Sequence, residues 1–330
     1  MTTAPSSPRF IHHRWRFGDD APAASENNYE CSAGVLPADE NRSNYKVDMF
    51  ASQTRYAPSV REKHKGKINM NPISSAKRIV VKVGTSTLTH STGKINIRRM
   101  VKLCSVLADL HNSGMEVVLV TSGAIGVGVG KLGLKERPKD IPGRQAAATV
   151  GQCELMFMYD KHFGENGVKT GQLLITKSDI ENDKRRENLE NTFEKLFEYE
   201  AVPIINENDS VATEEIVYGD NDSLSAIVAR LIKADALIIL SDIDGLFDDN
   251  PNENPDARLI PVVREITDDI KALCGGAGTD RGTGGMITKI HAAEITTEAG
   301  IPTVVMNGTA PQDIYKLIDG HSIGTLFTAK

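Results

Sequence analysis

The feature that most constrains the fold is an alternation of two patterns that begins near residue 76. Short runs of consecutive valine, isoleucine and leucine, such as RIVVKV at 78–83 and EVVLV at 116–120, are separated by longer segments with apolar residues at helical spacing. A strand that is apolar on both faces is typical of a parallel sheet, because helices then cover both sides. The chain is therefore predicted to be an α/β protein with an open, mostly parallel sheet and helices on each face.

The remaining elements follow from the same two patterns. Further strands are predicted at 171–176, 202–206, 236–242 and 302–306, and GTLF follows near the end of the chain. Helices are predicted at 95–114, 144–163, 185–200, 222–234, 266–273 and 286–299. Gly114 is placed to end the first of these helices, and Asn221 or Asp222 to cap the fourth.

Residues 1–75 differ from the rest of the chain. They are rich in serine, proline, asparagine and charged residues and show no sustained period, a composition typical of a disordered or non-native extension. A small binding element around Trp15 is the alternative. The segment has no apolar stretch of the kind found in secretory signals, and its acidic residues disfavour a transit peptide. We expect the functional protein to begin near Met70 and residues 1–69 to be dispensable.

Composition excludes several classes of function. The 330 residues carry a net charge of −6, whereas a nucleic-acid partner would call for a basic face. No apolar run approaches the ~18 residues that indicate a membrane span. The four cysteines lie far apart without a CxxC pair, so a zinc or disulfide framework is disfavoured and a cytoplasmic location is expected.

Polar and small residues follow the predicted strands. In an open α/β sheet, ligands bind beyond the carboxyl ends of the strands. The segments at those ends are Gly84-Thr85-Ser86, Thr121-Ser122-Gly123-Ala124, Asn206-Glu207-Asn208-Asp209 and Ser241-Asp242. The sequence therefore predicts a binding site at this edge of the sheet.

Lys82 lies inside the first predicted strand, among apolar neighbours. An ammonium group is almost never fully buried without a partner. The side chain either extends to solvent at the strand end or reaches over the carboxyl edge toward a phosphate group. In the second case, Gly84 would let the backbone approach that phosphate and offer its N–H group.

The segment TSGAIGVGVG at 121–130 follows the second strand. Its glycines at 126, 128 and 130 lack the Gly-x-Gly-x-x-Gly spacing of a dinucleotide fingerprint, so NAD binding is disfavoured. Ser122 and Gly123 lie at a strand-to-helix junction, where hydroxyl and N–H groups can bind an anion.

A second glycine-rich segment, GTGGMITK at 282–289, leads into the predicted helix at 286–299. It lacks the Walker spacing, because no Gly-Lys-Ser/Thr occurs in it. Taken alone it is equally compatible with a surface loop. Taken with Lys82, its Lys289 suggests that two ammonium groups from distant parts of the chain converge on a triphosphate.

Two clusters of acids and amides lie between these lysines. INENDSVAT at 205–213 and YGDNDSLS at 218–225 contain Glu207, Asp209, Asp220 and Asp222 together with Asn206, Asn208 and Asn221. Turns and helix caps also favour Asp and Asn, and capping and function are equally open for Asp222. The clusters could instead hold an amino group, orient lysines or bind magnesium. They contain no histidine, which argues against zinc or iron.

Six motifs occur in an order and spacing that resemble the glutamate 5-kinases of the amino-acid kinase family. They are VVKVGTS, VTSGAI, INENDSVAT, GDNDSLSA, LSDIDGLF and GTGGMITK, and the resemblance covers about residues 77–329. It implies a three-layer αβα sandwich with a mostly parallel eight-stranded sheet over residues 76–330. Within it, residues 76–234 would bind glutamate and residues 235–330 would bind ATP.

The resemblance also implies roles for individual residues. By match of motif, contacts to ATP or glutamate fall on Lys82, Ser122, Asp209 and Asn221. Contacts to the nucleotide fall on Ser241, Asp242, Thr283, Gly284, Gly285, Met286, Ile287, Thr288 and Lys289. Asp220 and Asp222 match acidic positions of the active site. We expect Ser122, Asp209 and Asn221 to set the choice of acceptor.

The implied reaction transfers a phosphoryl group from ATP to the 5-carboxylate of L-glutamate, giving L-glutamyl 5-phosphate for proline synthesis. A carboxyl group with a pKa near ~4.3 is ionised at neutral pH, so no general base is required. Lys82 and Lys289 are assigned to neutralising the moving phosphoryl group, with N–H groups at Gly84 and Gly123 assisting. Asp220 would orient a lysine or an amide, and Mg²⁺ would bridge phosphate oxygens.

Two differences from many relatives stand out. The chain ends at GTLFTAK without the C-terminal PUA domain that many relatives carry, and Val217 stands where many have a basic residue. The family further suggests a homodimer or homotetramer and feedback inhibition by proline. The competing functions are other kinases of the family, acting on acetylglutamate, aspartate, carbamate or uridylate, and a non-catalytic amino-acid sensor. Retention of both lysines argues against the sensor.

Overall fold

The computed structural model describes residues 71–90, 94–211, 221–251, 253–274 and 285–330. The extension predicted over residues 1–75 lies outside the described residues as far as Met70, as does Val217, whereas residues 71–75 are described and pack against the fold. Asp220, Thr283 and Gly284 also lie outside the described residues.

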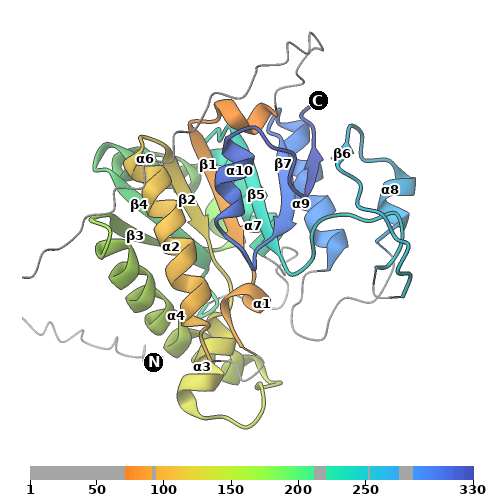
Figure 1. The fold of residues 1–330 in the computed structure, drawn as a ribbon. Coiled ribbons are helices and arrows are strands. Elements are labelled where there is room, and N and C mark those ends of the chain that lie inside the picture. Colours follow the sequence, from red (N-terminus) through yellow and green to blue (C-terminus); the bar gives the residue numbers. More distant parts are fainter. Residues whose placement is uncertain (1–70, 91–93, 212–220, 252, 275–284) are drawn as a thin grey trace, which may run out of the picture. The chain divides into compact units, whose positions relative to one another are not determined.

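An eight-stranded sheet forms the middle layer (Figure 1). The strands are β1 (Arg78–Val83), β2 (Glu116–Val120), β3 (Lys169–Ile175), β4 (Ala201–Glu207), β5 (Ala236–Ser241), β6 (Val262–Val263), β7 (Thr303–Asn307) and β8 (Thr325–Phe327). Their order across the sheet is β3-β4-β2-β1-β5-β7-β8-β6, and every neighbouring pair is parallel except β7 with β8. The predicted mostly parallel sheet is confirmed.

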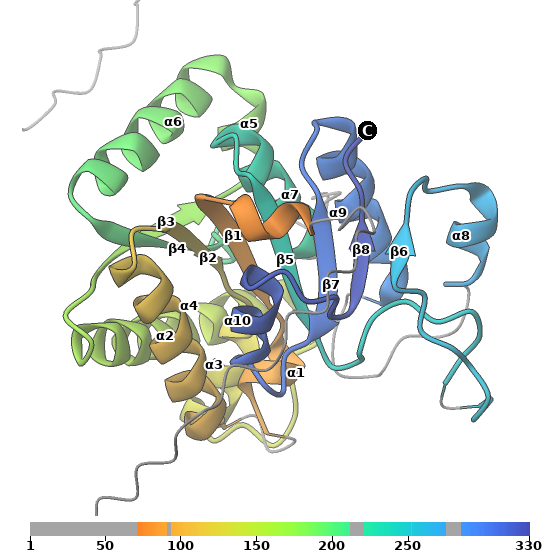
Figure 2. The ribbon, with the colours of Figure 1, turned by 45° about the horizontal axis from the view of Figure 1, so that its top comes forward.

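Helices cover both faces of this sheet (Figure 2). They are α1 (Thr85–Leu88), α2 (Ile97–Asn112), α3 (Ala124–Leu132), α4 (Ile141–Gly164), α5 (Lys177–Glu181), α6 (Asp183–Glu198), α7 (Asn221–Leu231), α8 (Asp268–Ala272), α9 (Met286–Glu298) and α10 (Asp313–Ile318). Apolar residues of α2, α3, α4 and α10 form one core with the sheet, and those of α5, α6, α7 and α9 form another.

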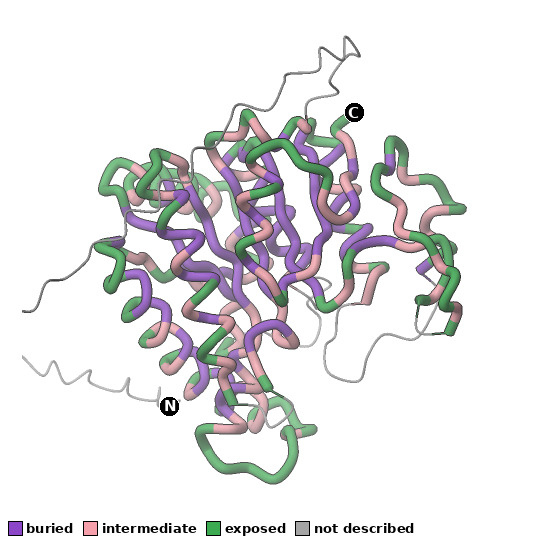
Figure 3. Tube along the Cα trace, in the orientation of Figure 1, coloured by how far each residue is buried: buried purple, intermediate pink, exposed green. Residues whose placement is uncertain are grey.

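Burial explains why the strands lack polar alternation. Five of the six residues of β1 and all six of β5 are buried, because each lies between two helical layers (Figure 3). Successive side chains of a strand point to opposite faces. Ile79, Val81 and Val83 of β1 accordingly enter the first core, and Val80 enters the second. Lys82 shares the alternation of Val80 and so points toward the layer of α7 and α9.

The described part of the chain begins with a short 3₁₀-helix, η1 (Pro72–Ser75), which is tied to the fold. The Asn71 side chain accepts a hydrogen bond from Ile73 N at 3.1 Å and donates one to the His321 carbonyl oxygen at 3.1 Å. Ile73 is fully buried in the first core. A chain that keeps these contacts must therefore retain Asn71.

We predict that deleting residues 1–69 leaves both the folded structure and the activity intact, because the contacts of Asn71 and Ile73 survive in the shortened chain. Thermal unfolding and ADP release compare the shortened and full chains. A shortened chain that unfolds at the same temperature but has lost turnover would show that the extension contributes to the site. Deletion to residue 76, which removes η1, is the control and should lower the unfolding temperature.

Candidate active site

Three charged side chains from distant segments meet at the carboxyl edge of the sheet. Lys82 Nζ lies 2.5 Å from Asp222 Oδ1, and Lys289 Nζ lies 3.1 Å from Asp222 Oδ2. Only 8% of each lysine side chain is exposed, and none of the Asp222 side chain is. The two ammonium groups are thus held next to each other by one carboxylate. We call these three residues the lysine–aspartate cluster.

The position of each member follows from local structure. Lys82 points toward α7 and α9 because of its place in β1. Asp222 is the second residue of α7, and Lys289 is the fourth residue of α9. Helices α7 and α9 pack against each other, which brings their first turns side by side. The helix starts therefore place the carboxylate between the two lysines.

The charges of the cluster do not cancel. Burial alone would raise the pKa of the Asp222 carboxyl, but the Lys82 and Lys289 ammonium groups outweigh it and lower the pKa from 3.8 to about 2. The Thr288 hydroxyl donates a further hydrogen bond to Asp222 Oδ2 at 2.8 Å. One ionised carboxylate faces two ammonium groups, so the cluster carries a net positive charge. Such a cluster can stabilise negative charge that develops on a bound group during a reaction.

Asp222 therefore does not cap α7, which was one of two roles that its position suggested. Asn221 precedes it in the first turn of α7, and its amide NH₂ group is engaged elsewhere. The Asn221 Nδ2 group donates to the Thr121 carbonyl oxygen, to Ser122 Oγ at 3.0 Å and to Asn206 Oδ1 at 2.7 Å. These contacts tie the start of α7 to the carboxyl ends of β2 and β4.

The same hydrogen bonds continue into helix α4. Asn206 Nδ2 donates to Gln152 Oε1 at 2.8 Å, so Ser122, Asn221, Asn206 and Gln152 form one connected set, which we call the amide chain. Asn206 and Gln152 are buried. A connected set of this kind holds each side chain in one orientation.

Two glycines at the carboxyl edge of the sheet lie where a ligand could approach the backbone closely. Gly123 has φ of 97° at the start of α3, a backbone conformation that favours glycine. Gly84 precedes α1, and a Cβ atom added there would lie 3.7 Å from Lys82 Nζ. Both glycines therefore lie at the carboxyl edge of the sheet, where the lysine–aspartate cluster also lies.

The glycines of the GVGVG segment have a different role. They lie within α3, and a Cβ atom added at Gly128 would lie 1.8 Å from the Ala147 carbonyl oxygen of α4. Gly151 of α4 is equally close to the Ala124 carbonyl oxygen of α3. Gly128 and Gly151 allow the two helices to pack backbone to backbone, which accounts for Gly128 without a dinucleotide.

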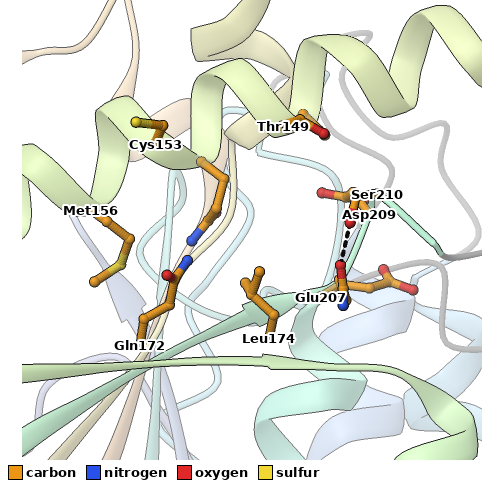
Figure 4. Close-up of a pocket in the computed structure, with 11 residues that line it drawn as sticks. Thr149, Cys153, Met156, Gln172, Leu174, Glu207, Asp209 and Ser210 are labelled. Carbon is orange, nitrogen blue, oxygen red and sulfur yellow. Dashed lines mark hydrogen bonds between the residues drawn. The ribbon is translucent and has the colours of Figure 1, made fainter. Parts of the chain in front are cut away.

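A pocket of about 350 Å³ opens beside the amide chain (Figure 4). Its lining includes Thr149, Gln152 and Met156 of α4, Gln172 and Leu174 of β3, and the loop after β4. Figure 4 shows Glu207, Asp209 and Ser210 at one end, across the pocket from Met156 and Gln172. Burial raises the pKa of the Asp209 carboxyl, while the positive charge of Arg137 partly offsets this. Carboxylates at one end of a small pocket suit an ammonium group.

The remaining predicted nucleotide residues lie on either side of the cluster. Gly285 precedes α9, and Met286, Ile287 and Thr288 form its first turn with Lys289. Ser241 ends β5, and its hydroxyl donates to Asp242 Oδ1 at 3.2 Å. Ser241 and Asp242 therefore lie at the same edge of the sheet, on the strand next to β1.

Gln152 is the residue of this region that the sequence patterns did not reveal. It lies on the buried face of α4, in line with Ala148, Leu155 and Tyr159, at spacings of four, three and four residues. A glutamine within such a buried line is a signal that could have identified it, because a buried amide requires hydrogen-bond partners.

The described ranges lack two kinds of feature. No helix there is both long enough and apolar enough to span a bilayer. Nor is any group of three or more His, Cys, Asp or Glu side chains in those ranges arranged to hold a metal ion.

Known proteins resemble this chain in sequence over most of its length. The profile of the amino acid kinase family matches residues 77–307. A glutamate 5-kinase of Clostridium acetobutylicum is 54% identical over 258 residues, which are 78% of this chain and 97% of that protein. One from Listeria monocytogenes is 51% identical over 262 residues, 78% of this chain and 95% of that protein. One from Caldanaerobacter subterraneus is 53% identical, over 76% of this chain and 67% of that protein.

Solved structures share the fold at low sequence identity. A carbamate kinase from Giardia lamblia, bound to AMP-PNP, superposes with a TM-score of 0.56 at 15% identity, covering 78% of this chain and all of that one. An isopentenyl phosphate kinase superposes with a TM-score of 0.54 at 18% identity, covering 76% of this chain and all of that one. These structures have the same three-layer arrangement.

Proposed function

This chain belongs to the amino acid kinase family, and we propose that it transfers the γ-phosphoryl group of ATP to the 5-carboxylate of L-glutamate, the first step of proline synthesis. The observation that carries the proposal is the net positive cluster of Lys82, Asp222 and Lys289 at the edge of the sheet. The acceptor pocket beside the amide chain supports it.

The reaction needs charge neutralisation more than proton transfer. The glutamate 5-carboxylate is ionised at neutral pH, because the ordinary pKa of such a group is ~4.3, and it can attack the γ-phosphorus without a general base. One of its oxygens forms the new P–O bond, and the bond to ADP breaks with its electron pair passing to the β-phosphate oxygen. No proton moves in this step. The barrier lies in bringing a carboxylate against a triphosphate, which two adjacent ammonium groups reduce.

We assign the nucleotide to the residues around the start of α9. Lys82 and Lys289 contact the phosphates, and N–H groups at Gly84 and Gly123 assist them. The other nucleotide contacts are Ser241, Asp242, Gly285, Met286, Ile287 and Thr288, with Thr283, Gly284 and the orienting Asp220 outside the described residues. In this assignment residues 235–330 bind ATP, with Lys82 contributed by the preceding part.

Magnesium would enter with the nucleotide. Mg²⁺ commonly binds substrate phosphates and keeps several waters, with few protein ligands. That fits the described residues, in which the Asp222 carboxylate is already engaged by two ammonium groups and no acidic cluster is arranged for a metal. The protein residues at the phosphates are then the lysines, which bind and orient the oxygens.

We assign the acceptor to Ser122, Asp209 and Asn221. Asp209 lines the pocket at its acidic end and would bind the α-ammonium group of glutamate. Ser122 and Asn221 are hydrogen-bonded to each other next to Gly123, where the 5-carboxylate would lie. All three precede residue 235, in keeping with a glutamate-binding part at 76–234.

The proposed function is tested by ADP release from ATP and Mg²⁺ with different acceptors. L-glutamate should support turnover, and hydroxylamine should trap its acyl phosphate as the hydroxamate. Acetylglutamate, aspartate, carbamate and uridylate serve as the competing acceptors. Preferential turnover with one of these four would identify that compound, and not glutamate, as the acceptor. Turnover with neither glutamate nor any of the four would favour an amino-acid sensor.

Replacing Asp209 with alanine should raise the KM for L-glutamate while leaving the KM for ATP nearly unchanged. The carboxylate lies in the pocket and not at the lysine–aspartate cluster, so its loss removes the partner of the ammonium group only. Loss of a hydrogen bond to a charged group corresponds to about 10- to 100-fold in KM. Steady-state kinetics with each substrate varied in turn measures both values. A larger change in the ATP KM would move Asp209 to the nucleotide site.

A further inference from the structure

Gln152 has one buried hydrogen-bonding group that no described residue satisfies. Its side chain projects from α4 into the lining of the pocket, and only 9% of the residue is exposed. The Oε1 atom accepts a hydrogen bond from Asn206 Nδ2 at 2.8 Å. The Nε2 atom, although buried, has no hydrogen-bond partner in the part of the chain that the structure describes.

The orientation of this amide follows from its neighbours. Asn206 Oδ1 accepts hydrogen bonds from Asn221 Nδ2 at 2.7 Å and from Glu207 N at 3.0 Å. Because these are both donors, the Asn206 oxygen is committed, and its Nδ2 group must donate to the next residue. Gln152 must then present its oxygen to Asn206. Its Nε2 group, in a residue that lines the pocket, is left as a donor without an acceptor among the described residues.

A buried donor without an acceptor is uncommon in native proteins, and a ligand is one way to satisfy it. The other side-chain donors of the lining have an acceptor or belong to more exposed residues, such as Asn208. The Thr149 hydroxyl donates to the Gln145 carbonyl oxygen at 2.9 Å, and the Ser210 hydroxyl donates to Asn208 Oδ1 at 2.6 Å. Gln172 is exposed. The donor at Gln152 is therefore the buried one available to an incoming acceptor group.

The proposed substrate has one acceptor group that the assignments above leave unbound. The 5-carboxylate goes to the phosphoryl-transfer region, and the ammonium group goes to Asp209. The α-carboxylate remains, and it would lie among Glu207 and Asp209, whose charges repel it. A neutral amide donor can hold a carboxylate there without cancelling the acidic charge that attracts the ammonium group.

We propose that Gln152 Nε2 donates a hydrogen bond to the α-carboxylate of the acceptor amino acid, and that Gln152 thereby selects α-amino dicarboxylates over chains that lack this group. The inference rests on the proposed function, because it explains how the proposed acceptor pocket would recognise glutamate. Gln152 acts through binding, and we assign it no part in the transfer of the phosphoryl group.

The test compares L-glutamate with 4-aminobutyrate, which is glutamate without its α-carboxylate. In Gln152→Glu the side chain keeps its length and an oxygen that accepts from Asn206, but an oxygen replaces the Nε2 donor. The kcat/KM for glutamate should fall about 10- to 100-fold, as expected for losing a hydrogen bond to a charged group. The kcat/KM for 4-aminobutyrate, or its Ki as a competitive inhibitor, should change little, and so should the KM for ATP.

Gln172→Glu is the matched control. It adds the same charge at the exposed side of the same pocket without removing a buried donor. An equal fall in the kcat/KM for glutamate in Gln172→Glu would show that the added charge alone causes the effect, and would overturn the proposal. An equal fall for both acceptors in Gln152→Glu would indicate a structural role and overturn it as well.

Gln152→Met covers the case in which Gln152→Glu does not fold. It removes the donor without adding charge and should reduce the preference for glutamate over 4-aminobutyrate in the same direction. The wild-type protein separates the two levels of inference. If it does not phosphorylate glutamate, the proposed function fails. If it does and both Gln152 variants keep the wild-type preference, only the role of Gln152 fails.

Discussion

Replacing either Lys82 or Lys289 with alanine is expected to lower kcat about 10²- to 10³-fold, as expected for the loss of one electrostatic stabiliser of a transition state. Each lysine supplies one of two ammonium groups that face a single carboxylate. Removal of either leaves one positive and one negative charge, so the net positive charge of the cluster disappears. The group that stabilises charge on the moving phosphoryl group is then lost.

These lysine variants should remain folded. Asp222 keeps one ammonium partner in each of them, so no buried carboxylate is left without a counter-charge. Turnover is measured by ADP release at saturating substrates, and folding by thermal unfolding. Lys195→Ala is the control, because this lysine is largely exposed and pairs with Glu198 on the surface of α6. Near-normal kcat in both Lys82→Ala and Lys289→Ala would refute the assignment of the cluster to catalysis.

Replacing Asp222 with asparagine is expected to destabilise the protein more than either lysine variant. The change keeps the shape of the side chain but leaves two buried ammonium groups with no carboxylate between them. Removing one partner of a buried ion pair costs about 3–5 kcal/mol in the free energy of unfolding. Denaturant unfolding at neutral pH measures the loss, and turnover should fall with it because the lysines are no longer held together.

The pH dependence of the free energy of unfolding gives a separate test of the Asp222 carboxylate. Its pKa is about 2 in the folded protein, whereas an unperturbed aspartate has a pKa of 3.8, so folding lowers the value. Its contribution to stability is therefore fully present above about pH 4 and decreases as the pH falls toward 2. Asp222→Asn should lack this part of the acid-induced loss.

A second replacement tests whether the cost comes from the loss of the carboxylate that holds the two lysines. Adding Lys82→Met to Asp222→Asn removes one of the two like charges, so the double variant should be more stable than Asp222→Asn alone. Additive losses from the two changes would show that the residues are not coupled.

Sequence patterns located most of the fold. Strands β1 and β2 begin and end at the predicted residues, and α6, α7 and α9 begin within two residues of theirs. The patterns missed α5, α10 and β6, of five, six and two residues, because elements this short contain too few residues to show a period. Both faces of the central strands are apolar, and that property is present in the sequence itself.

Some residues of the candidate site could be predicted from the sequence, and others could not. Lys82, Lys289, Ser122 and Asp209 were predicted from their place at strand ends and in motifs. Asp222 was equally compatible with a helix cap, because the preference of helix starts for aspartate does not depend on what the side chain faces. Gln152 was missed because it lies in the middle of a helix, away from every motif.

The sequence by itself determined most of the longer strands and helices and which edge of the sheet holds the polar residues, since these depend on the spacing of side chains along one segment. Only the tertiary structure decided that one carboxylate holds both lysines and that a glutamine lining the pocket has a buried donor without an acceptor among the described residues. The crossovers of the sheet bring β1, α7 and α9 together. The charge of a buried group and the direction of an amide depend on the neighbours that the fold supplies, and these come from distant parts of the chain.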